Sequence, residues 1–241
     1  MKIIAELMHY QKLNETIRLA QDGEVVIENC IGQRYIGSGM SGKNIQIIGT
    51  PGNALGAYLN GSRIVVYGNS QEAVGDTMNG GEIVIHGSAG DAPGYAMRGG
   101  KILIEGNAGY RAGIHMKQYQ DKTPLLVVGG RAGSFLGEYQ AGGTIIVLGL
   151  NGDENRPPVG NFCGTGMHGG KIYLRSSVLP HDLPAQVIAK EADEADMAEI
   201  EPHLSEFCRE FDKNYDEVRN RTFYLLTPDS KNPYKQLYTM N

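Results

Sequence analysis

The chain has 241 residues, of which 41% are hydrophobic and 34 are glycine, and its formal net charge is −5 at neutral pH. This length is enough to bury a sizeable core, and the absence of a basic stripe or a stacking platform of aromatic residues argues against nucleic-acid binding. No apolar run is long enough to span a bilayer, and the first residues contain no signal-peptide core. We therefore expect a cytoplasmic protein without nucleic-acid or membrane partners.

The glycines divide the chain into three parts. All of them except Gly23 lie between residues 32 and 170, and residues 181–241 instead hold seven Lys/Arg and thirteen Asp/Glu. We predict an N-terminal cap with a short helix over residues 1–24, a glycine-rich domain over residues 25–177, and an acidic helical and extended tail over residues 178–241.

The N-terminal cap contains one helix-like pattern. Leu13, Ile17 and Ala20 recur at helical spacing and Gly23 follows them, which predicts a short helix that closes the open end of the glycine-rich domain. A first strand is expected over residues 25–29.

A repeat of glycine, alternating Ile or Val, and glycine runs through residues 25–177. Its spacing is nineteen residues in the first part and looser afterwards. Glycine before and after a strand supplies the positive φ that a corner requires. The predicted corner glycines are Gly42, Gly49, Gly61, Gly68, Gly80, Gly87, Gly99, Gly106, Gly129, Gly142, Gly149, Gly164, Gly166 and Gly169.

The strands of this repeat alternate with period two, so one face of each strand should point into a core. A period near twenty residues indicates stacked copies of one unit, each covered by its neighbours. The predicted fold is therefore all-β, a single-stranded parallel β-helix of about seven coils. The expected inward pairs are Ile45/Ile47, Ile64/Val66, Ile83/Ile85, Ile102/Ile104, Leu125/Val127, Ile145/Val147 and Ile172/Leu174.

The outward strand positions are also mostly apolar, which favours a face covered by a protein partner. These positions are Gln46, Val65, Val84, Leu103, Leu126 and Ile146.

The tail shows helical spacing from Ala195 onward, with Pro202 starting a second helix or kinking a single one. From Arg221 the chain is expected to form an extended arm. Its aromatic residues predict a second docking surface. They are Phe207, Phe211, Phe223, Tyr224, Tyr234 and Tyr238.

Two segments, Gly37–Gly42 and Gly164–Gly169, match the dinucleotide pattern G-x-G-x-x-G. A dinucleotide site should open a helix after a strand, whereas both segments lead into predicted strands. Corner-forming glycines are the preferred interpretation.

The sequence gives only weak signals for a metal site or for acid–base catalysis. His86, His115 and His168 have no second ligand at metal-binding spacing, and Glu138 and Asp91 could act as acid and base only in an environment that a sequence does not reveal. We therefore assign no catalytic, cofactor-binding or metal-binding residue to the chain.

The three cysteines, Cys30, Cys163 and Cys208, are an odd number at wide spacing. They fit small buried residues in a reducing compartment better than a disulfide framework or a metal site.

Three segments together resemble the C-terminal GXGXG domain of the glutamate synthase large subunit. They are residues 32–37 (GQRYIG), 130–149 (GRAGSFLGEYQAGGTIIVLG) and 159–170 (VGNFCGTGMHGG). The resemblance covers roughly residues 25–175. It implies a right-handed β-helix without catalytic residues, a scaffold between a glutamine amidotransferase that releases ammonia and an FMN and iron–sulfur synthase that makes glutamate from 2-oxoglutarate.

We expect the chain to consist of the scaffold alone, and the resemblance then implies amidotransferase-like and FMN synthase-like partner subunits that carry the FMN and the iron–sulfur cluster. The expected role lies in ammonia assimilation and glutamate biosynthesis, with no activity from the chain alone and with self-association as a further expectation. N-methylglutamate synthase and, more distantly, the C subunit of formylmethanofuran dehydrogenase carry similar domains. A β-helical carbohydrate lyase or hydrolase is a rival from another class, and a left-handed acyltransferase is disfavoured because the six-residue repeat is absent.

Overall fold

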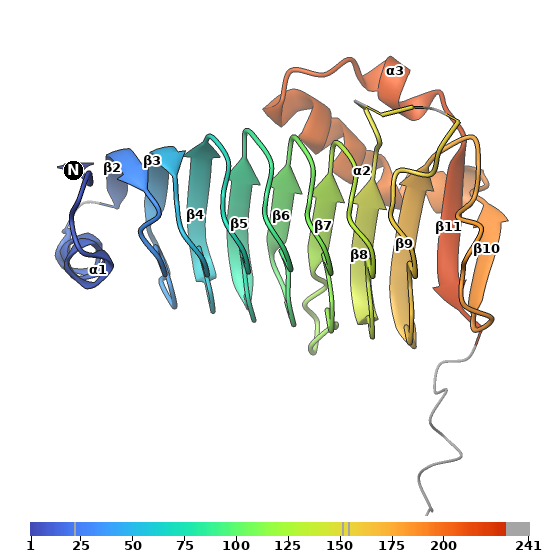
Figure 1. Cartoon of the computed structure of the whole chain (residues 1–241), viewed down its shortest axis with the longest axis horizontal. Coiled ribbons are helices and arrows are strands. Elements are labelled where there is room, and N and C mark those ends of the chain that lie inside the picture. Colours follow the sequence, from blue (N-terminus) through green and yellow to red (C-terminus); the bar gives the residue numbers. More distant parts are fainter. Residues whose placement is uncertain (22, 151, 154, 230–241) are drawn as a thin grey trace, which may run out of the picture.

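A computed structural model describes residues 1–21, 23–150, 152–153 and 155–229 (Figure 1). Within these residues the chain forms eleven strands and three helices. The strands are β1 (Lys2–Ile4), β2 (Glu24–Ile31), β3 (Asn44–Thr50), β4 (Asn60–Tyr67), β5 (Gly80–Ile85), β6 (Lys101–Ile104), β7 (Leu125–Val128), β8 (Ala141–Val147), β9 (Gly169–Arg175), β10 (Val187–Glu191) and β11 (Phe223–Pro228). The helices are α1 (Tyr10–Leu19), α2 (Glu194–Glu210) and α3 (Tyr215–Arg219).

All eleven of these strands belong to one sheet. The spatial order follows the chain from β1 to β9, and β11 and then β10 complete the sheet. Neighbours from β1 to β9 are parallel, whereas β11 pairs antiparallel with both β9 and β10. Figure 1 shows the strands side by side in a row, with α1 at the N-terminal edge and α2 and α3 packed over the C-terminal half.

The predicted fold class, an all-β right-handed parallel β-helix of about seven coils, is wrong. The described strands form one mixed eleven-stranded sheet, and three helices accompany it. The segments that return from one parallel strand to the next are mostly turns, linked by isolated bridges such as Ser70 with Ala89 and Ala89 with Ala108. The alternation of Ile and Val correctly indicates parallel neighbouring strands, but it carries no information about how the return segments fold.

The inner side of the sheet is lined by one matched row of side chains. Successive side chains of a strand point to opposite sides, and the register keeps equivalent residues in line. The row is Ile45, Ile64, Ile83, Ile102, Leu126, Ile145 and Ile172. Apolar residues of the return segments, among them Leu55, Leu59 and Val74, pack against this row with no exposed surface.

Strand β7 differs from its prediction by one residue. Leu126 pairs with Ile102 and lies inside, whereas Leu125 and Val127 lie on the outer side. The predicted inward pair Leu125/Val127 and the predicted outward position Leu126 are therefore wrong. The cause is the double glycine after β7, because Gly130 rather than Gly129 is the partner of Gly106, whose carbonyl accepts its N–H at 2.8 Å.

The return segments carry a second column of glycines that the strand pattern does not show. Its members all have positive φ and are Gly37, Gly56, Gly75, Gly94, Gly113, Gly137 and Gly164. A Cβ atom on Gly75 would lie 2.5 Å from Cδ1 of Ile102, and one on Gly56 would lie 2.5 Å from Cδ1 of Ile83. At every column position except Gly94 and Gly164, glycine is therefore required both for its conformation and because the inner isoleucine of the following repeat occupies the space.

The outer side of the sheet is covered by the chain's own tail rather than left for a partner. Val84, Leu103 and Val127 form one apolar cluster with Leu204 and Phe207 of α2, and all five side chains are fully buried. The prediction that a partner protein covers the outward apolar positions is wrong for this part of the sheet. Burial of apolar surface is the main source of the stability of this contact.

Ion pairs fix the position of α2 along the strands. Arg63 of β4 contacts Glu82 at 2.7 Å and Glu210 of α2 at 2.8 Å, and Lys101 of β6 contacts both Glu82, at 3.2 Å, and Glu206. These partly buried networks hold the helix in register with three neighbouring strands.

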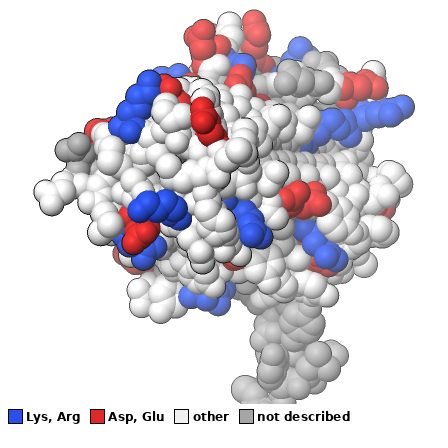
Figure 2. Space-filling model, turned by 60° about the vertical axis from the view of Figure 1, so that its left-hand side comes forward, with Lys and Arg blue, Asp and Glu red and all other residues white. Residues whose placement is uncertain are grey.

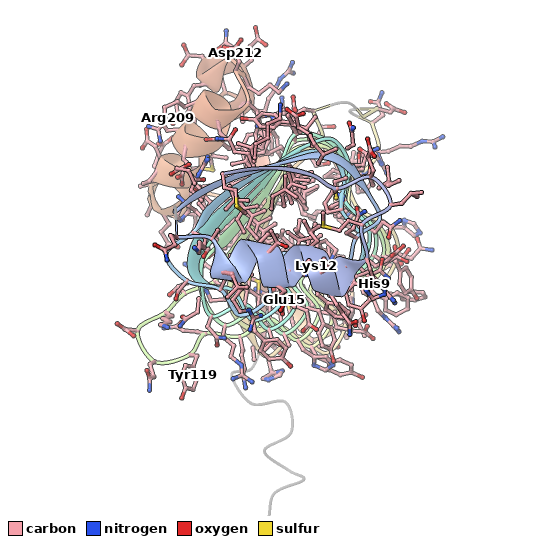
Figure 3. All side chains as sticks on the ribbon, turned by 90° about the vertical axis from the view of Figure 1, so that its left-hand side faces the viewer. His9, Lys12, Glu15, Tyr119, Arg209 and Asp212 are labelled. Carbon is pink, nitrogen blue, oxygen red and sulfur yellow. The ribbon has the colours of Figure 1, made fainter. Side chains whose placement is uncertain are left out.

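The predicted helices are confirmed in position. Helix α1 lies across the N-terminal end of the sheet with Lys12 and Glu15 at its surface (Figure 3). Helix α2 is one continuous helix that contains Pro202, so the alternative of a second helix starting there is wrong. Asp193 caps its N-terminus by accepting hydrogen bonds from the N–H groups of Ala195 and Asp196.

The extended arm predicted from Arg221 is part of the sheet. Phe223 and Leu226 lie in β11, which inserts between β9 and β10. Phe207, Phe211 and Phe223 are buried against the outer side of the sheet, so they do not form a free docking surface. The predicted docking residues Tyr234 and Tyr238 lie outside the described residues.

Candidate interaction surface

Aromatic side chains, most of them exposed, gather together with Arg111 on the return segments of successive repeats, around the column glycines Gly113, Gly137 and Gly164. We call this group the aromatic corner. Its members are Tyr95, Tyr110, Arg111, His115, Phe135, Tyr139 and Phe162. The exposed fractions are 39% for Tyr110, 38% for Tyr139 and 48% for Phe162.

The first row of the aromatic corner is a stack of three rings with one cation. The ring centroids of Tyr110 and Phe135 are 5.2 Å apart, and those of Phe135 and Phe162 are 4.9 Å apart. The guanidinium carbon of Arg111 lies 5.1 Å from the Tyr110 ring and 5.5 Å from the Phe135 ring. These separations are those of aromatic pairs and cation–π contacts.

The second row lies two residues beyond the column glycines. The rings of His115 and Tyr139 are stacked, with centroids 5.2 Å apart and an angle of 9° between planes, and Tyr95 meets His115 edge-on at 6.0 Å. Arg111 connects the two rows, because its Nε lies 3.0 Å from a carboxylate oxygen of Glu138, the residue before Tyr139.

The backbone of the aromatic corner is strained. Arg111, His115, Phe135, Tyr139 and Phe162 all have φ between 54° and 62°. L-residues avoid this left-handed region, at a cost of roughly 1–2 kcal/mol each, and glycine would occupy it without that cost. In earlier repeats the equivalent positions hold both small residues, among them Ala54, Ala73, Ala92 and Ala96, and the exposed tyrosines Tyr35 and Tyr58. Strained backbone that holds large exposed side chains is a mark of functional surfaces.

Two of the three histidines noted in the sequence, His86 and His115, belong to aromatic contacts. His86 stacks on Tyr67 at 5.0 Å and meets Phe211 edge-on at 5.1 Å, next to the covered outer side of the sheet, while His115 belongs to the aromatic corner. Nδ1 of His168 lies 3.2 Å from the Gly166 carbonyl oxygen. Among the described residues, no group of three or more His, Cys, Asp or Glu is placed to hold a metal ion.

The candidate acid and base, Glu138 and Asp91, have different partners. Glu138 is paired with Arg111, whereas a carboxylate oxygen of Asp91 accepts the backbone N–H of Tyr110 at 2.8 Å. The structure therefore gives each carboxylate a separate partner.

The cysteines are buried and unpaired with one another. Burial raises the pKa of the Cys30 thiol to about 11 and that of Cys163 to about 12, and it also raises the pKa of Cys208. Since the thiolate is the reactive form, none of the three is activated as a nucleophile at neutral pH.

The predicted corner glycines divide into two groups. Positive φ occurs at Gly42, Gly49, Gly61, Gly68, Gly149, Gly164 and Gly166. The remainder, Gly80, Gly87, Gly99, Gly106, Gly129, Gly142 and Gly169, have another backbone conformation. In most of that group a Cβ atom would still clash, for example at 2.3 Å from the Glu105 carbonyl oxygen if placed on Gly129. Close approach of neighbouring backbones therefore requires glycine there.

Both G-x-G-x-x-G segments lead into strands, β3 and β9, as the sequence predicted. Neither opens a helix, so the backbone arrangement for holding a dinucleotide pyrophosphate is missing from them.

The face drawn in Figure 2 carries Lys and Arg side chains interspersed with Asp and Glu, with wide uncharged areas between them. In the described residues no helix has both the length and the apolar character for crossing a bilayer.

A mixed sheet whose parallel strands come from glycine-cornered repeats, with part of its outer side covered by the chain's own tail, defines a repeat protein with an exposed aromatic corner. The chain belongs to the GXGXG motif family, whose model matches residues 9–223. This confirms the resemblance on which the sequence interpretation depended.

Two similar proteins extend this comparison. The uncharacterized protein MJ1350 of Methanocaldococcus jannaschii is 45% identical over 249 residues, covering 98% of this chain and 95% of that protein. A solved chain of the formyltransferase/hydrolase complex (FhcABCD) of Methylorubrum extorquens, in complex with methylofuran, matches with a TM-score of 0.66. That match covers 88% of this chain and 76% of the other at 21% identity, so it shows likeness of fold.

Proposed function

We propose that this protein is a scaffold subunit of a multi-subunit complex and that a partner subunit docks on the aromatic corner. The main support for the proposal is that exposed aromatic side chains around Gly137 stand on strained backbone. Aromatic residues and Arg are the side chains enriched at the energetic centres of protein interfaces. Arg111 lies among these rings and is positioned by Glu138.

The rigidity of the repeats suits a scaffold role. The inner row of isoleucines and the glycine column interlock from one repeat to the next, with Gly113 set against Ile145 and Gly137 against Ile172. A surface built on such a sheet keeps the spacing of its side chains, which lowers the entropic cost of docking.

Within this proposal, the complex is of the glutamate synthase type. The chain would join an amidotransferase-like subunit, which releases ammonia, to an FMN synthase-like subunit that also carries the iron–sulfur cluster. Family membership supports this version. A second candidate is a complex of the formyltransferase/hydrolase kind, which the likeness to a chain of FhcABCD favours.

Affinity purification of the tagged full-length chain from its native host, followed by mass spectrometry, tests the proposal. We expect stoichiometric recovery of an amidotransferase-like chain and of an FMN-containing chain whose flavin is visible by absorbance. Recovery of formyltransferase and hydrolase chains instead would select the second candidate. Purification of the chain alone, under conditions that preserve other complexes of the host, would contradict a scaffold role.

A further inference from the structure

A loop between β6 and β7, residues 118–123, is inserted into the repeat and interrupts its nineteen-residue spacing. The loop turns back tightly, because the N–H groups of Tyr119 and Lys122 each donate to the other residue's carbonyl oxygen at 3.1 Å. Every residue from Lys117 to Thr123 is exposed. Figure 3 shows the loop with Tyr119 standing out from the stacked repeats.

Glycines of the flanking repeats hold this loop in place. A Cβ atom on Gly142 would clash with the backbone nitrogen of Gln118, and one on Gly99 would lie 3.0 Å from Cβ of Lys122. The two ends of the loop are therefore packed against the backbone of two different repeats. This packing gives its side chains a defined position on the surface.

Three cationic side chains meet at the base of the loop, and we call Arg98, Lys117 and Lys122 the basic patch. The N–H of Lys117 donates to the Met97 carbonyl oxygen at 3.0 Å, which sets Lys117 beside Arg98 of the preceding repeat. Lys122 packs over Gly99, the residue after Arg98. The three side chains therefore start from adjacent points of the backbone.

The charge of the basic patch is not neutralised within the part of the chain that the structure describes. No carboxylate there forms an ion pair with Arg98, Lys117 or Lys122, and Nε of the half-buried Arg98 is without a hydrogen-bond partner. The loop itself contains one acidic residue, Asp121. By contrast, Lys101 at the start of β6 is paired with two carboxylates.

We propose that the basic patch, together with Tyr119, is a docking site for an acidic peptide segment of a partner protein. Carboxylates form strong charge-assisted hydrogen bonds with Lys and Arg, and tyrosine is enriched at protein interfaces. The Tyr119 side chain is 47% exposed beside these cations. Three cations in one place match a few carboxylates, whereas a nucleic acid is bound along a longer basic stripe. Lys117 lies two residues after His115, so this site adjoins the aromatic corner.

Fluorescence anisotropy of the purified full-length protein tests this site, with fluorescein-labelled hexaglutamate as the probe and labelled hexaglutamine as the neutral comparison. We expect saturable binding of hexaglutamate that weakens as sodium chloride rises from about 0.05 M to about 0.5 M, because salt screens exposed charges. No saturable binding at the lower salt, or equal affinity for hexaglutamine, would overturn the proposal. An oligothymidylate that binds as tightly as hexaglutamate would overturn the assignment to a peptide.

Variants identify the place of binding. The Lys117→Gln, Lys122→Gln double variant should weaken hexaglutamate binding about fivefold or more, since two exposed charge contacts are lost. The Arg18→Gln, Arg209→Gln double variant removes two exposed arginines of α1 and α2. It is the control matched in net charge and should bind as the parent does. Equal binding by the two double variants, both with the parent's melting temperature, would overturn the placement.

A Phe162→Gly variant separates this site from the aromatic corner. It should bind hexaglutamate as the parent does, and a loss of binding would place the peptide on the aromatic corner instead. Because these measurements use the purified chain and a synthetic peptide, their outcome does not depend on the scaffold role proposed above.

Discussion

The contact between α2 and the outer side of the sheet predicts a large loss of stability when Phe207 is replaced by alanine. Phe207 is fully buried, and its ring lies directly over Gly129, so that a Cβ on that glycine would meet the ring at 2.7 Å. A phenylalanine buries about 150–250 Å², which at about 25 cal/mol per Å² is worth roughly 4–6 kcal/mol. A compact unfolded state lowers this figure, and Phe→Ala changes in cores cost about 3–5 kcal/mol. We therefore expect Phe207→Ala to lower the free energy of unfolding by about 3–5 kcal/mol.

Urea unfolding followed by circular dichroism measures this loss. Phe162→Ala is the matched control, since the same side chain is 48% exposed at the aromatic corner and its main contact is one ring pair worth about 0.5–1.5 kcal/mol. A Phe207→Ala variant whose free energy of unfolding lies within about 1 kcal/mol of the parent's would show that α2 does not pack on the sheet as described. The same conclusion would follow if Phe162→Ala lost as much free energy of unfolding as Phe207→Ala.

Two further changes test the column glycines and the cap of α2. Gly75→Ala should cost about 2–4 kcal/mol in urea unfolding, because it adds a left-handed alanine and a Cβ at 2.5 Å from Ile102. Gly42→Ala, with φ of 67° but nothing within 4 Å of its Cβ, should cost only about 1–2 kcal/mol, and equal costs would contradict the packing argument. The pKa of Asp193 is lowered, chiefly by the backbone hydrogen bond from Asp196, so its cap stabilises the folded state above the unfolded pKa and is lost as pH falls through the folded value. Asp193→Ala should therefore lower the melting temperature more at pH 7 than in acid well below the unfolded pKa of about 3.9, and a loss of the same size under both conditions would contradict this.

Much of the sheet could be predicted from the sequence, because local residue patterns determine its strands and their order. The alternation in segments such as Ile83–Ile85 determines which side chains face inward, and the glycine spacing determines which strands are neighbours. The register of β7 could not be predicted in the same way, since Gly129 and Gly130 are equally good local candidates and the choice depends on pairing with Gly106.

The tail shows the limit of local patterns more clearly. The apolar face of α2 and the apolar outer side of the sheet were both visible in the sequence, but their mutual contact depends on residues far apart, such as Arg63 and Glu210. The insertion of β11 between β9 and β10 likewise depends on long-range pairing. For this reason the sequence suggested a protein partner on the outer side of the sheet, where the chain's own helix α2 packs.

The aromatic corner had a signal in the sequence that the search for catalytic residues overlooked. Aligning the repeats on Gly113, Gly137 and Gly164 places Arg111, Phe135 and Phe162 at one position, two residues before each glycine.

The docking role of the aromatic corner is tested most directly by a quantitative pull-down from the native host with a Tyr139→Gly, Phe162→Gly double variant. Both residues have positive φ, so glycine removes the side chains while relieving backbone strain. Tyr58→Gly is the control, because Tyr58 has φ of 57° and is 55% exposed in an earlier repeat. We expect the double variant to keep the parent's melting temperature within a few degrees and to lose most of the partner subunits, about tenfold or more, while the control retains them. Recovery of the same partners in the same amounts by parent, double variant and control would contradict the aromatic corner as a docking surface.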